Sequence, residues 1–270
     1  MEMFGVKKIV DIVSEADKEV LKIYKNADFG LEYKEDNTPL TLADKVSHNT
    51  IIKGLTELYP SIPVISEEAE RTSFKERGNW EYFWLVDPLD GTKEFVKRNG
   101  EFTVNVALIH KGKPVLGVLS VPVLGLVYYA DVDKGVFKKD KDGSVKPIRA
   151  NISPGEEITV VKSRSHSSRL DKEILDGLGK VKEITAGSSL KFCYVAEGTA
   201  DIYLRGGRTM EWDTAAGHCI AETAGAKVRR FDGTELNYNK QSLLNEKFIC
   251  FVPSGRVTSA LSRAMPNILI

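Results

Sequence analysis

Two short stretches of the chain carry paired carboxylates directly after predicted strands. Residues 82–86 form an apolar run, and a turn-forming sequence follows it at once: Asp87-Pro88-Leu89-Asp90-Gly91-Thr92. A second apolar run, residues 63–66, ends on Glu67 and Glu68. A strand followed by a Pro/Gly turn can aim two carboxylates and a backbone carbonyl at one point, and Mg²⁺ prefers that set of oxygen ligands. Because α/β folds place ligand sites at strand ends, the pattern indicates a magnesium site.

Each of these carboxylates also has a purely structural interpretation. The stretch 87–92 fits a plain Asp-Gly turn with a capping aspartate, and Glu67 fits a solvated acidic turn. Asp44 stands three residues after Thr41, which is the spacing of a capping box at a helix start. Asp213 lies at the predicted start of another helix, where a carboxylate offsets the helix dipole. The presence of the whole set in one chain favours a metal site over unrelated turns and caps.

Three motifs, in this order, resemble those of the inositol monophosphatase superfamily, the lithium-sensitive, magnesium-dependent phosphatases. They are Ser66-Glu67-Glu68, Trp84-Leu85-Val86-Asp87-Pro88-Leu89-Asp90-Gly91-Thr92 and Trp212-Asp213-Thr214-Ala215-Ala216-Gly217. Within the superfamily the chain looks most like the bacterial 3′(2′),5′-bisphosphate nucleotidases of sulfate assimilation, through the stretches 91–95, 97–105 and 187–193. The resemblance covers nearly the whole chain and implies a layered αβαβα sandwich.

The resemblance implies a role for each acidic residue. The metal ligands would be Glu67, Asp87, Asp90 and Asp213 through their carboxylates, and Leu89 through its backbone carbonyl. The catalytic residues would be Asp44, Thr92 and Glu67; Asp44 and Thr92 orient the attacking water, and Asp44 also contacts a third metal ion. Gly91, Thr92 and Asp213 would contact the substrate. Two or three Mg²⁺ ions are expected, since they invert the field of acidic side chains that would otherwise repel a phosphate ester.

A substrate with two phosphates needs a second anion site away from the metal ions. Serines near a helix start can cradle a phosphate together with backbone N–H groups and a lysine. The resemblance implies that four residues of the second half hold it: His166, Ser188, Lys191 and Arg205. Residues 204–208 are basic, with Arg205 and Arg208, where inositol monophosphatases look acidic, and this favours a bisphosphate. The structural alternative is N-capping by Ser188 with solvated charges elsewhere.

Hydrophobic periodicity predicts the elements that position these residues. Apolar residues recur every three to four positions over residues 6–24 and 42–58, which indicates two amphipathic helices. Residues 102–146 read as several strands of an antiparallel sheet, separated by Gly- and Asp-containing turns. After residue 155 the chain alternates, with strands near 158–162, 202–204 and 248–252 and helices near 170–178, 190–197, 212–223 and 257–265.

These elements predict a mixed α+β and α/β fold in two subdomains. The first, residues 1–155, is sheet-rich with antiparallel strands and carries most of the metal ligands. The second, residues 156–270, is an α/β unit that carries Asp213 and the second-phosphate site. Three histidines outside the proposed site, and the three cysteines of the chain, are expected to be structural: His48, His110, His218, Cys193, Cys219 and Cys250.

Composition argues against several other classes of protein. Lys and Arg total 38 and Asp and Glu total 38, so a partner such as a nucleic-acid polymer or an anionic membrane is not expected. Residues 114–130 hold no charge, but two prolines and two glycines interrupt them, which indicates two buried strands around a turn rather than a transmembrane segment. Three cysteines without a Cys-x-x-Cys motif fit a cytoplasmic location, with peripheral association at the inner membrane as a variant.

The function predicted is that of a Mg²⁺-dependent phosphomonoesterase that converts adenosine 3′,5′-bisphosphate to AMP and phosphate. A sister activity, hydrolysis of inositol-1-phosphate or fructose-1,6-bisphosphate, would keep the same metal ligands without needing the basic second-phosphate set. A non-catalytic, phosphate-binding regulatory protein is the alternative from another class; it predicts the loss of a metal carboxylate, and all are present. A homodimer is one option for the assembly, and the preference for adenine rests on the resemblance alone.

Overall fold

The computed structural model describes residues 4–26, 30–33, 39–153, 155–165, 168–266 and 268. The helices are α1 (Val6–Tyr24), α2 (Leu42–Leu58), α3 (Phe74–Arg77), α4 (Thr92–Val96), α5 (Arg169–Leu178), α6 (Leu190–Ala196), α7 (Glu211–Thr223) and α8 (Gly255–Ala264), with a 3₁₀ helix η1 (Pro122–Leu124). The strands are β1 (Glu32–Tyr33), β2 (Pro39–Leu40), β3 (Val64–Ser66), β4 (Tyr82–Asp90), β5 (Thr103–His110), β6 (Lys113–Val121), β7 (Leu126–Asp131), β8 (Gly135–Lys139), β9 (Val145–Pro147), β10 (Ile158–Ser163), β11 (Val181–Ala186), β12 (Ile202–Arg205), β13 (Lys227–Arg230) and β14 (Phe248–Phe251).

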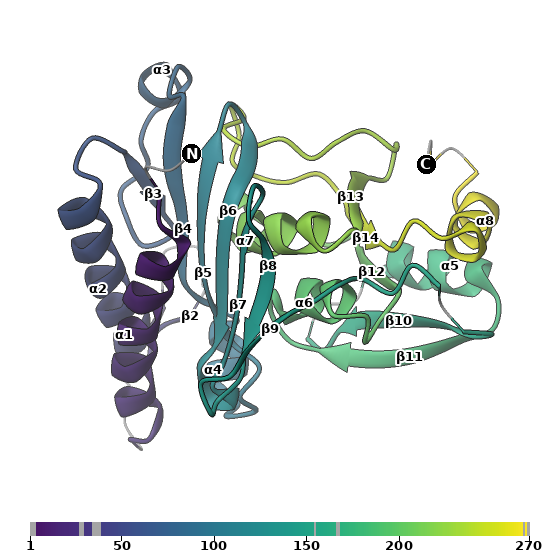
Figure 1. Ribbon diagram of the computed structural model, residues 1–270, viewed down its shortest axis with the longest axis horizontal. Helices are drawn as coiled ribbons and strands as arrows, with labels where there is room; N and C mark the ends of the chain where they lie inside the picture. The colour runs from purple at the N-terminus through teal and green to yellow at the C-terminus, as the bar shows by residue number, and fades with distance from the viewer. Residues whose placement is uncertain are drawn as a thin grey trace.

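Two large sheets and three layers of helices alternate through the described part of the chain (Figure 1), and β1 and β2 form a small separate sheet. Helices α1 and α2 pack on one face of the first sheet, and α7 packs against strands β4 to β7 of the same sheet. Helix α6 contacts β10, β12 and β14 of the second sheet, so α6 and α7 form the middle layer. Helices α5 and α8 pack together on the far side. The αβαβα sandwich implied by the resemblance is confirmed.

The first sheet follows the chain in the order β3-β4-β5-β6-β7-β8-β9. Neighbouring strands are antiparallel, except that β3 and β4 run parallel. Helices cover both of its faces, and side chains such as Trp84 and Val106 are buried against α1 and α2. Burial on both faces explains why its strands read as continuous apolar runs rather than as alternating ones. The two buried strands predicted over residues 114–130 are confirmed as β6 and β7, with η1 between them.

Strand β4 is longer than the sequence indicated. The prediction that it ends at Val86 was wrong, because β4 continues to Asp90 through Pro88. Its register with β5 shifts between Asp87 and Asp90. Such a bulge inserts extra residues without losing the strand and redirects the side chains around it, and proline is tolerated there because a bulge leaves backbone donors unpaired. The two aspartates therefore lie on an irregular strand end and not on a free turn.

The second sheet has the order β11-β10-β12-β14-β13. The three central strands and the four predicted helices are confirmed, but β11 and β13 were not predicted. These two are the edge strands, and their sequences contain charged residues, Lys182 and Glu183 in β11 and two arginines in β13. Edge strands commonly carry charges because charges oppose pairing with other chains, and this weakens the hydrophobic pattern. The short helices α3 and α4 were also missed.

The subdomain division near residue 155 falls between the two sheets, since β9 ends at Pro147 and β10 begins at Ile158. One hydrophobic cluster nevertheless joins residues from both halves, for example Leu119 of β6, Ile202 of β12 and Ile220 of α7. The described part of the chain thus shares a core across the division, and two separate folding units stay a prediction.

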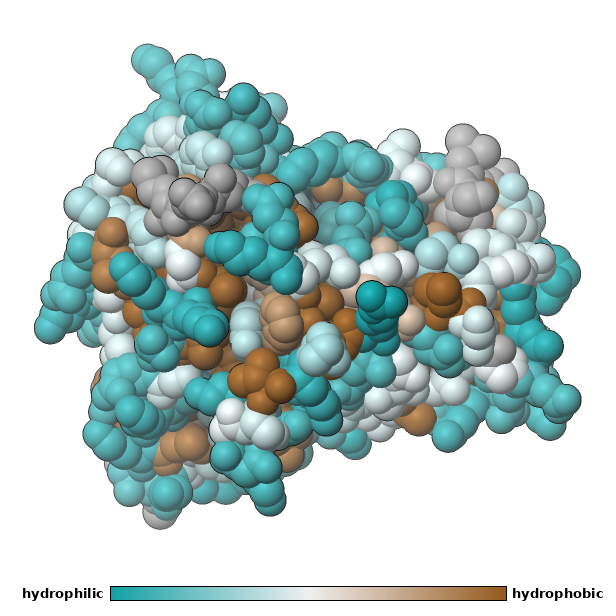
Figure 2. Space-filling model, viewed as in Figure 1, coloured by the Kyte–Doolittle hydropathy of each residue, from teal (hydrophilic) through white to brown (hydrophobic). Residues whose placement is uncertain are grey.

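The surface that faces the viewer in Figure 2 is mostly hydrophilic, with hydrophobic residues in separate patches. Scattered exposed apolar residues are normal for a folded protein and identify no particular partner. The homodimer therefore stays a prediction. Among the described residues, no helix combines the length and apolar character that crossing a bilayer requires.

Candidate functional site

Three carboxylates from separate parts of the chain meet at one end of the first sheet. Glu67 follows β3, Asp87 lies near the end of β4, and Asp213 lies in the first turn of α7. Because β3 and β4 are parallel, their carboxyl ends lie at the same edge of the sheet. Helix α7, from the second half of the chain, packs against that sheet. Each of the three residues offers a carboxylate oxygen, and these oxygens all lie within 4.8 Å of one another.

Asp87 has the environment of a cation ligand. Its side chain is 1% exposed; Oδ1 accepts a hydrogen bond from the backbone N–H of Leu89 (3.1 Å), whereas Oδ2 has no hydrogen-bond partner among the described residues. Burial raises the pKa of Asp87 well above its usual value, and Glu67, Asp90 and Asp213 raise it further. A buried, unpaired carboxylate oxygen is costly, and a divalent cation would remove both the repulsion and the missing contact. The residues present therefore fit a magnesium site.

Asp213 is held at the same edge by the start of α7. Its Oδ2 accepts a hydrogen bond from the backbone N–H of Met210 (2.8 Å). Burial raises the pKa of Asp213 well above its usual value, followed by repulsion from Asp90 and Glu67, while the Met210 hydrogen bond opposes the rise. The carboxylate thus offsets the helix dipole, as the structural interpretation held, and also faces the other acidic side chains.

Asp90 is placed differently from the other predicted ligands. Its Oδ2 accepts hydrogen bonds from the hydroxyl of Ser188 (2.5 Å) and from the backbone N–H of Ser189 (2.7 Å), and the Ser189 hydroxyl lies 2.7 Å away. One oxygen of Asp90 thus anchors the start of α6, which belongs to the second half of the chain. Coordination by Asp90, and by the carbonyl of Leu89, stays a prediction.

Asp44 caps α2 with one carboxylate oxygen and faces Thr92 with the other. Its Oδ2 accepts hydrogen bonds from the backbone N–H (2.7 Å) and the hydroxyl (2.6 Å) of Thr41, so the capping box at the start of α2 is confirmed. Its Oδ1 lies 3.3 Å from the hydroxyl of Thr92, which is also 3.5 Å from the carbonyl of Leu89. Burial raises the pKa of Asp44 to about 6, with smaller contributions from Glu68 and Glu67.

Gly91 connects the bulged end of β4 to α4 and needs to be glycine. Its φ is 90°, in the left-handed region, which other residues rarely adopt. A Cβ atom at this position would lie 3.3 Å from the Cβ of Ser188 and 3.4 Å from an oxygen of Glu94. The glycine therefore allows the backbone of the first half to approach the turn before α6.

The predicted second-phosphate residues are already engaged with the protein. Lys191 is 2% exposed, and its ammonium donates to the backbone carbonyls of Ala186 (3.4 Å) and Ser188. Burial lowers the pKa of Lys191 to about 8. At the end of β12, Arg205 donates to the carbonyl of Arg208 (3.0 Å), and its Nε is buried without a hydrogen-bond partner among the described residues.

Ser188 shapes the turn before α6 rather than capping that helix. It adopts a left-handed backbone conformation with φ 53°, and its hydroxyl also lies 2.6 Å from that of Thr103 on β5. Ser189 is the N-cap residue, without a side-chain capping bond. His166 lies outside the described residues. Phosphate binding by Ser188, Lys191, Arg205 and His166 therefore stays a prediction.

On sequence grounds Ser189 was only part of the candidate phosphate cradle before α6, but the structure places it between the two halves of the site. Its hydroxyl is 2.7 Å from Oδ2 of Asp90 and 2.5 Å from the backbone carbonyl of Asp213. Asn105 on β5 donates to the same hydroxyl (3.2 Å). A serine pair before a predicted helix was visible in the sequence, but its partners are distant along the chain and could not be inferred from spacing.

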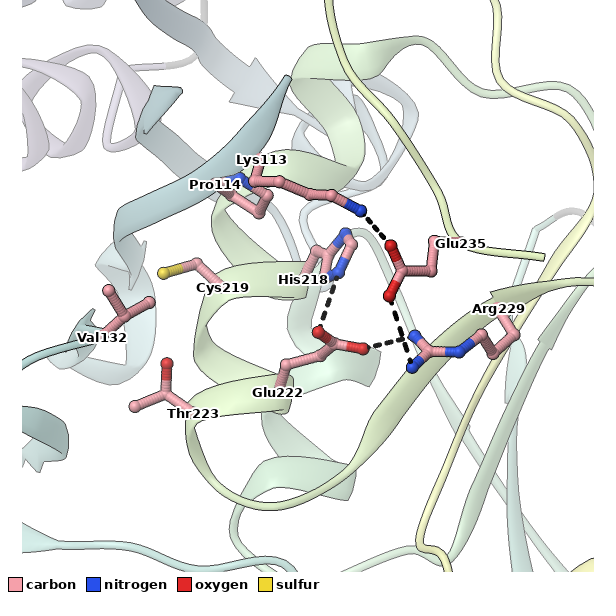
Figure 3. A pocket seen from close by; sticks show the side chains of 9 residues that line it. All are labelled: Lys113, Pro114, Val132, His218, Cys219, Glu222, Thr223, Arg229 and Glu235. Carbon is pink, nitrogen blue, oxygen red and sulfur yellow. Dashed lines mark hydrogen bonds and ion pairs between the residues drawn. The ribbon is translucent and has the colours of Figure 1, made fainter. Parts of the chain in front are cut away.

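A cavity of about 470 Å³ lies at the other end of α7, away from the carboxylates. Figure 3 shows its polar wall, in which Glu222 lies between His218 and Arg229, and Glu235 lies between Lys113 and Arg229. The structural interpretation of His218 is confirmed, because its ring is buried and lies 2.9 Å from the hydroxyl of Tyr238. The three cysteines are likewise buried and unpaired with one another, as expected.

Comparisons with known proteins agree with this arrangement. Residues 6–263 match the model of the inositol monophosphatase family. The chain is 46% identical over 255 residues to a protein of Buchnera aphidicola subsp. Acyrthosiphon pisum named 3′(2′),5′-bisphosphate nucleotidase CysQ, covering 94% of this chain and 93% of the relative. It is 49% identical over 216 residues to the protein of that name from Escherichia coli (strain K12), covering 80% of this chain and 86% of the relative.

Solved structures show the same relationship. The crystal structure of CysQ from Bacteroides thetaiotaomicron, described as a bacterial member of the inositol monophosphatase family, superposes with a TM-score of 0.82 at 38% identity, covering 92% of this chain and 96% of that one. The suppressor protein suhB from Bartonella henselae shares the fold at 23% identity, with a TM-score of 0.81 and coverage of 96% and 97%. Sequence and structure together show that the chain belongs to the inositol monophosphatase family.

Proposed function

We propose that this chain is a Mg²⁺-dependent phosphatase that hydrolyses adenosine 3′,5′-bisphosphate to AMP and phosphate. The observation that carries the proposal is the meeting of Glu67, Asp87 and Asp213, with one buried oxygen of Asp87 unpaired among the described residues, beside the Asp44–Thr92 pair. The choice of substrate is supported by the relatives named 3′(2′),5′-bisphosphate nucleotidase.

The side chains of the cluster supply the binding part of the reaction. Glu67, Asp87 and Asp213 would hold Mg²⁺, with Asp90 and the carbonyl of Leu89 as further predicted ligands. Ions held here would neutralise the charge of a phosphate ester and acidify a water molecule. In a reaction of this kind positioning and charge neutralisation supply most of the rate enhancement, so no nucleophile from the protein is needed. Two or three ions are proposed.

Asp44 and Thr92 are proposed to orient the attacking water. The Thr92 hydroxyl can donate to Oδ1 of Asp44, which lies 3.3 Å away, and its oxygen then accepts a hydrogen bond from water. Asp44 is fixed through its other oxygen by Thr41, so the acceptor cannot turn away. Gly91 would let the phosphate approach the backbone at the start of α4, where N–H groups favour an anion.

Lys191, Arg205, Ser188 and His166 are proposed to bind the second phosphate. Lys191 and Arg205 lie near enough to interact, since the charge of Arg205 contributes to lowering the pKa of Lys191. Their hydrogen bonds with backbone carbonyls hold them in place before a ligand arrives. We also propose that the protein acts in the cytoplasm, where a nucleotide bisphosphate is its partner, and that it can form a homodimer.

A phosphate-release assay with three substrates tests the proposal. Adenosine 3′,5′-bisphosphate, inositol-1-phosphate and fructose-1,6-bisphosphate are compared with Mg²⁺ and with EDTA. We expect the highest kcat/KM for adenosine 3′,5′-bisphosphate, no turnover in EDTA, and recovery when Mg²⁺ is restored. Undiminished turnover in EDTA would contradict the metal site, and a preference for inositol-1-phosphate would establish the sister activity instead.

A further inference from the structure

The segment from Tyr238 to Asn245 supports the start of α7 and has no role in the function proposed above. The backbone N–H of Asn245 donates to the carbonyl of Thr209 (2.8 Å), and that of Glu211 donates to the carbonyl of Leu243 (2.9 Å). Between them, Met210 and Leu244 form an antiparallel bridge. The segment therefore pairs with the residues that lead into α7.

The carboxylate of Glu211 fastens the same segment from the other side. This side chain is fully buried, and it accepts hydrogen bonds from the backbone N–H groups of Asn239 (2.7 Å) and Lys240 (3.0 Å) and from the ammonium of Lys240 (2.8 Å). A buried carboxylate with this many charge-assisted and backbone partners is held firmly. The segment and the first turn of α7 thus form one rigid unit.

Asn245 bonds residues on either side of a proposed metal ligand, Asp213. Its side chain is 7% exposed, and its amide nitrogen donates to the carbonyl of Met210 (2.7 Å) and the hydroxyl of Thr214 (3.0 Å), with the Thr209 hydroxyl 3.3 Å away. These partners lie on both sides of Asp213 in the chain. The amide therefore spans the first turn of the helix at the position of the carboxylate.

One peptide group connects Asn245 directly to Asp213. The carbonyl of Thr209 accepts the backbone hydrogen bond of Asn245 (2.8 Å). The N–H of the same peptide belongs to Met210, and it donates to Oδ2 of Asp213 (2.8 Å). Because a peptide group is planar and rigid, fixing its carbonyl also fixes the direction of its N–H, and with it one oxygen of Asp213.

We propose that Asn245 is a positioning residue for the metal site. Its side-chain amide fixes the first turn of α7 through the carbonyl of Met210 and the hydroxyl of Thr214, while its backbone N–H holds the Thr209–Met210 peptide. Together these contacts hold the carboxylate of Asp213 facing Glu67 and Asp87. The hydrogen bonds continue away from the site through Thr214 and the hydroxyl of Tyr238 (3.3 Å) to His218 at the cavity in Figure 3. Partners that orient a metal ligand commonly change metal affinity by about 10- to 100-fold when they are removed.

The inference rests on the proposed metal centre, and calorimetric titration of Mg²⁺ into the metal-free protein tests it. N245A removes the side-chain amide, and N245L removes its donors while keeping its size and adding no charge; both keep the backbone N–H that bonds Thr209, so they test the side-chain contacts alone. N237A is the matched control, because Asn237 directly precedes the segment and has an exposed side chain. We expect the Kd for Mg²⁺ to rise about 10- to 100-fold in both Asn245 variants and to stay unchanged in N237A.

Melting temperatures in EDTA separate positioning from general support of the fold. If N245A and N245L lower the melting temperature but bind Mg²⁺ as tightly as the wild type, Asn245 is structural only and the inference is overturned. If one variant fails to fold, the other decides by the same criterion, and T214V, which removes the hydroxyl acceptor of Asn245, provides a third test. A wild-type protein that binds no Mg²⁺ would instead contradict the proposed metal centre itself.

Discussion

The carboxylates at the end of the first sheet and the cations near the start of α6 are held in opposite ways. Asp87 keeps one buried oxygen without a hydrogen-bond partner among the described residues, and like charges surround it. Lys191 is equally buried, but backbone carbonyls accept its hydrogen bonds. Asp87 thus keeps an unpaired buried oxygen among like charges, whereas the ammonium of Lys191 is satisfied by the backbone.

This difference indicates which region depends more on a ligand. Repulsion among Glu67, Asp87 and Asp213 lowers the free energy of unfolding, and a cation bound between them would raise it again. The stability of the acidic region is therefore expected to depend on a bound cation. The basic region keeps its shape without one. Substitutions in the acidic region should therefore remove activity outright, and those in the basic region should change which substrate is preferred.

The largest effect is expected for Asp87→Asn. Losing a charged ligand should lower kcat/KM by at least about 10²- to 10³-fold, the cost of removing one transition-state contact, and Mg²⁺ binding should weaken with it. Because the neutral amide would no longer repel Glu67 and Asp213, the melting temperature in EDTA should rise. Assays of phosphate release and thermal denaturation check both. Asp133→Asn, at an exposed aspartate, is the control, and wild-type activity in the Asp87 variant would contradict the contrast drawn above.

Thr92→Ala should have the next largest effect and should act on kcat rather than on KM. Its hydroxyl faces Asp44 (3.3 Å), and general-base assistance contributes about 10²- to 10⁴-fold. Thr92→Ser, which keeps the hydroxyl, should recover most of the rate. Steady-state kinetics with both variants are decisive, since an unchanged kcat in Thr92→Ala would leave this residue only its place at the first position of α4.

A smaller and selective effect is expected in the basic region. If Arg205 binds the second phosphate as proposed, Arg205→Ala removes a charge-assisted hydrogen bond worth roughly 1.5–3 kcal/mol, so kcat/KM for adenosine 3′,5′-bisphosphate should fall about 10- to 150-fold. Inositol-1-phosphate has no second phosphate and should be turned over as before. Arg169→Ala, at a highly exposed arginine, serves as the control.

Lys191→Ala should behave differently from Arg205→Ala. Because Lys191 also holds the turn between Ala186 and Ser188, we expect a lower melting temperature in addition to the loss on the bisphosphate. Equal losses on both substrates for Arg205→Ala would show that this region serves the fold or the metal site and not substrate choice.

Features that depend on neighbouring residues in the chain were predicted from the sequence, and features that depend on distant residues were not. The predicted positions of helices α1 and α2 agree with the structure, because an apolar stripe and, for α2, a capping box are local signals. The bulge in β4 was missed, since the register between Asp87 and Asp90 depends on β5. The carboxylates were found because strand ends and turns place them locally. The contacts of Ser189 and Asn245 were missed because their partners lie far away in the chain.

The basic residues could be identified from the sequence, but their hydrogen-bond partners could not. Lys191 and Arg205 stood out in the sequence as cations of the second half, and the structure places Lys191 where the charges of Asp90 and Arg205 both affect its pKa. Charge alone could not reveal that the ammonium of Lys191 already serves two carbonyls. The sequence shows that a basic residue can donate hydrogen bonds, and only the structure shows which acceptors receive them.

Asp17 on α1 provides the last and smallest test, because it is a half-buried carboxylate outside the site. Its carboxylate accepts a hydrogen bond from the hydroxyl of Ser120 on β6 (2.7 Å), and burial raises its pKa to about 7. In the unfolded chain an aspartate has a pKa of about 3.9. Below that value Asp17 is protonated in both states and costs nothing, but as the pH rises from about 4 to 7 the unfolded state loses its proton first.

The free energy of unfolding should therefore decline over this range, by at most about 1.4 kcal/mol per pH unit, and level off above pH 7. Asp17→Asn should remove this part of the pH dependence and leave kcat/KM unchanged, whereas Asp11→Asn, at an exposed position on the same helix, should do neither. Urea denaturation at several pH values measures it. Since burial rather than a neighbouring charge raises the pKa of Asp17, Mg²⁺ should not alter its contribution, whereas Mg²⁺ should stabilise the fold through Asp87. A Mg²⁺-dependent effect of Asp17→Asn would show that the two carboxylates are not independent.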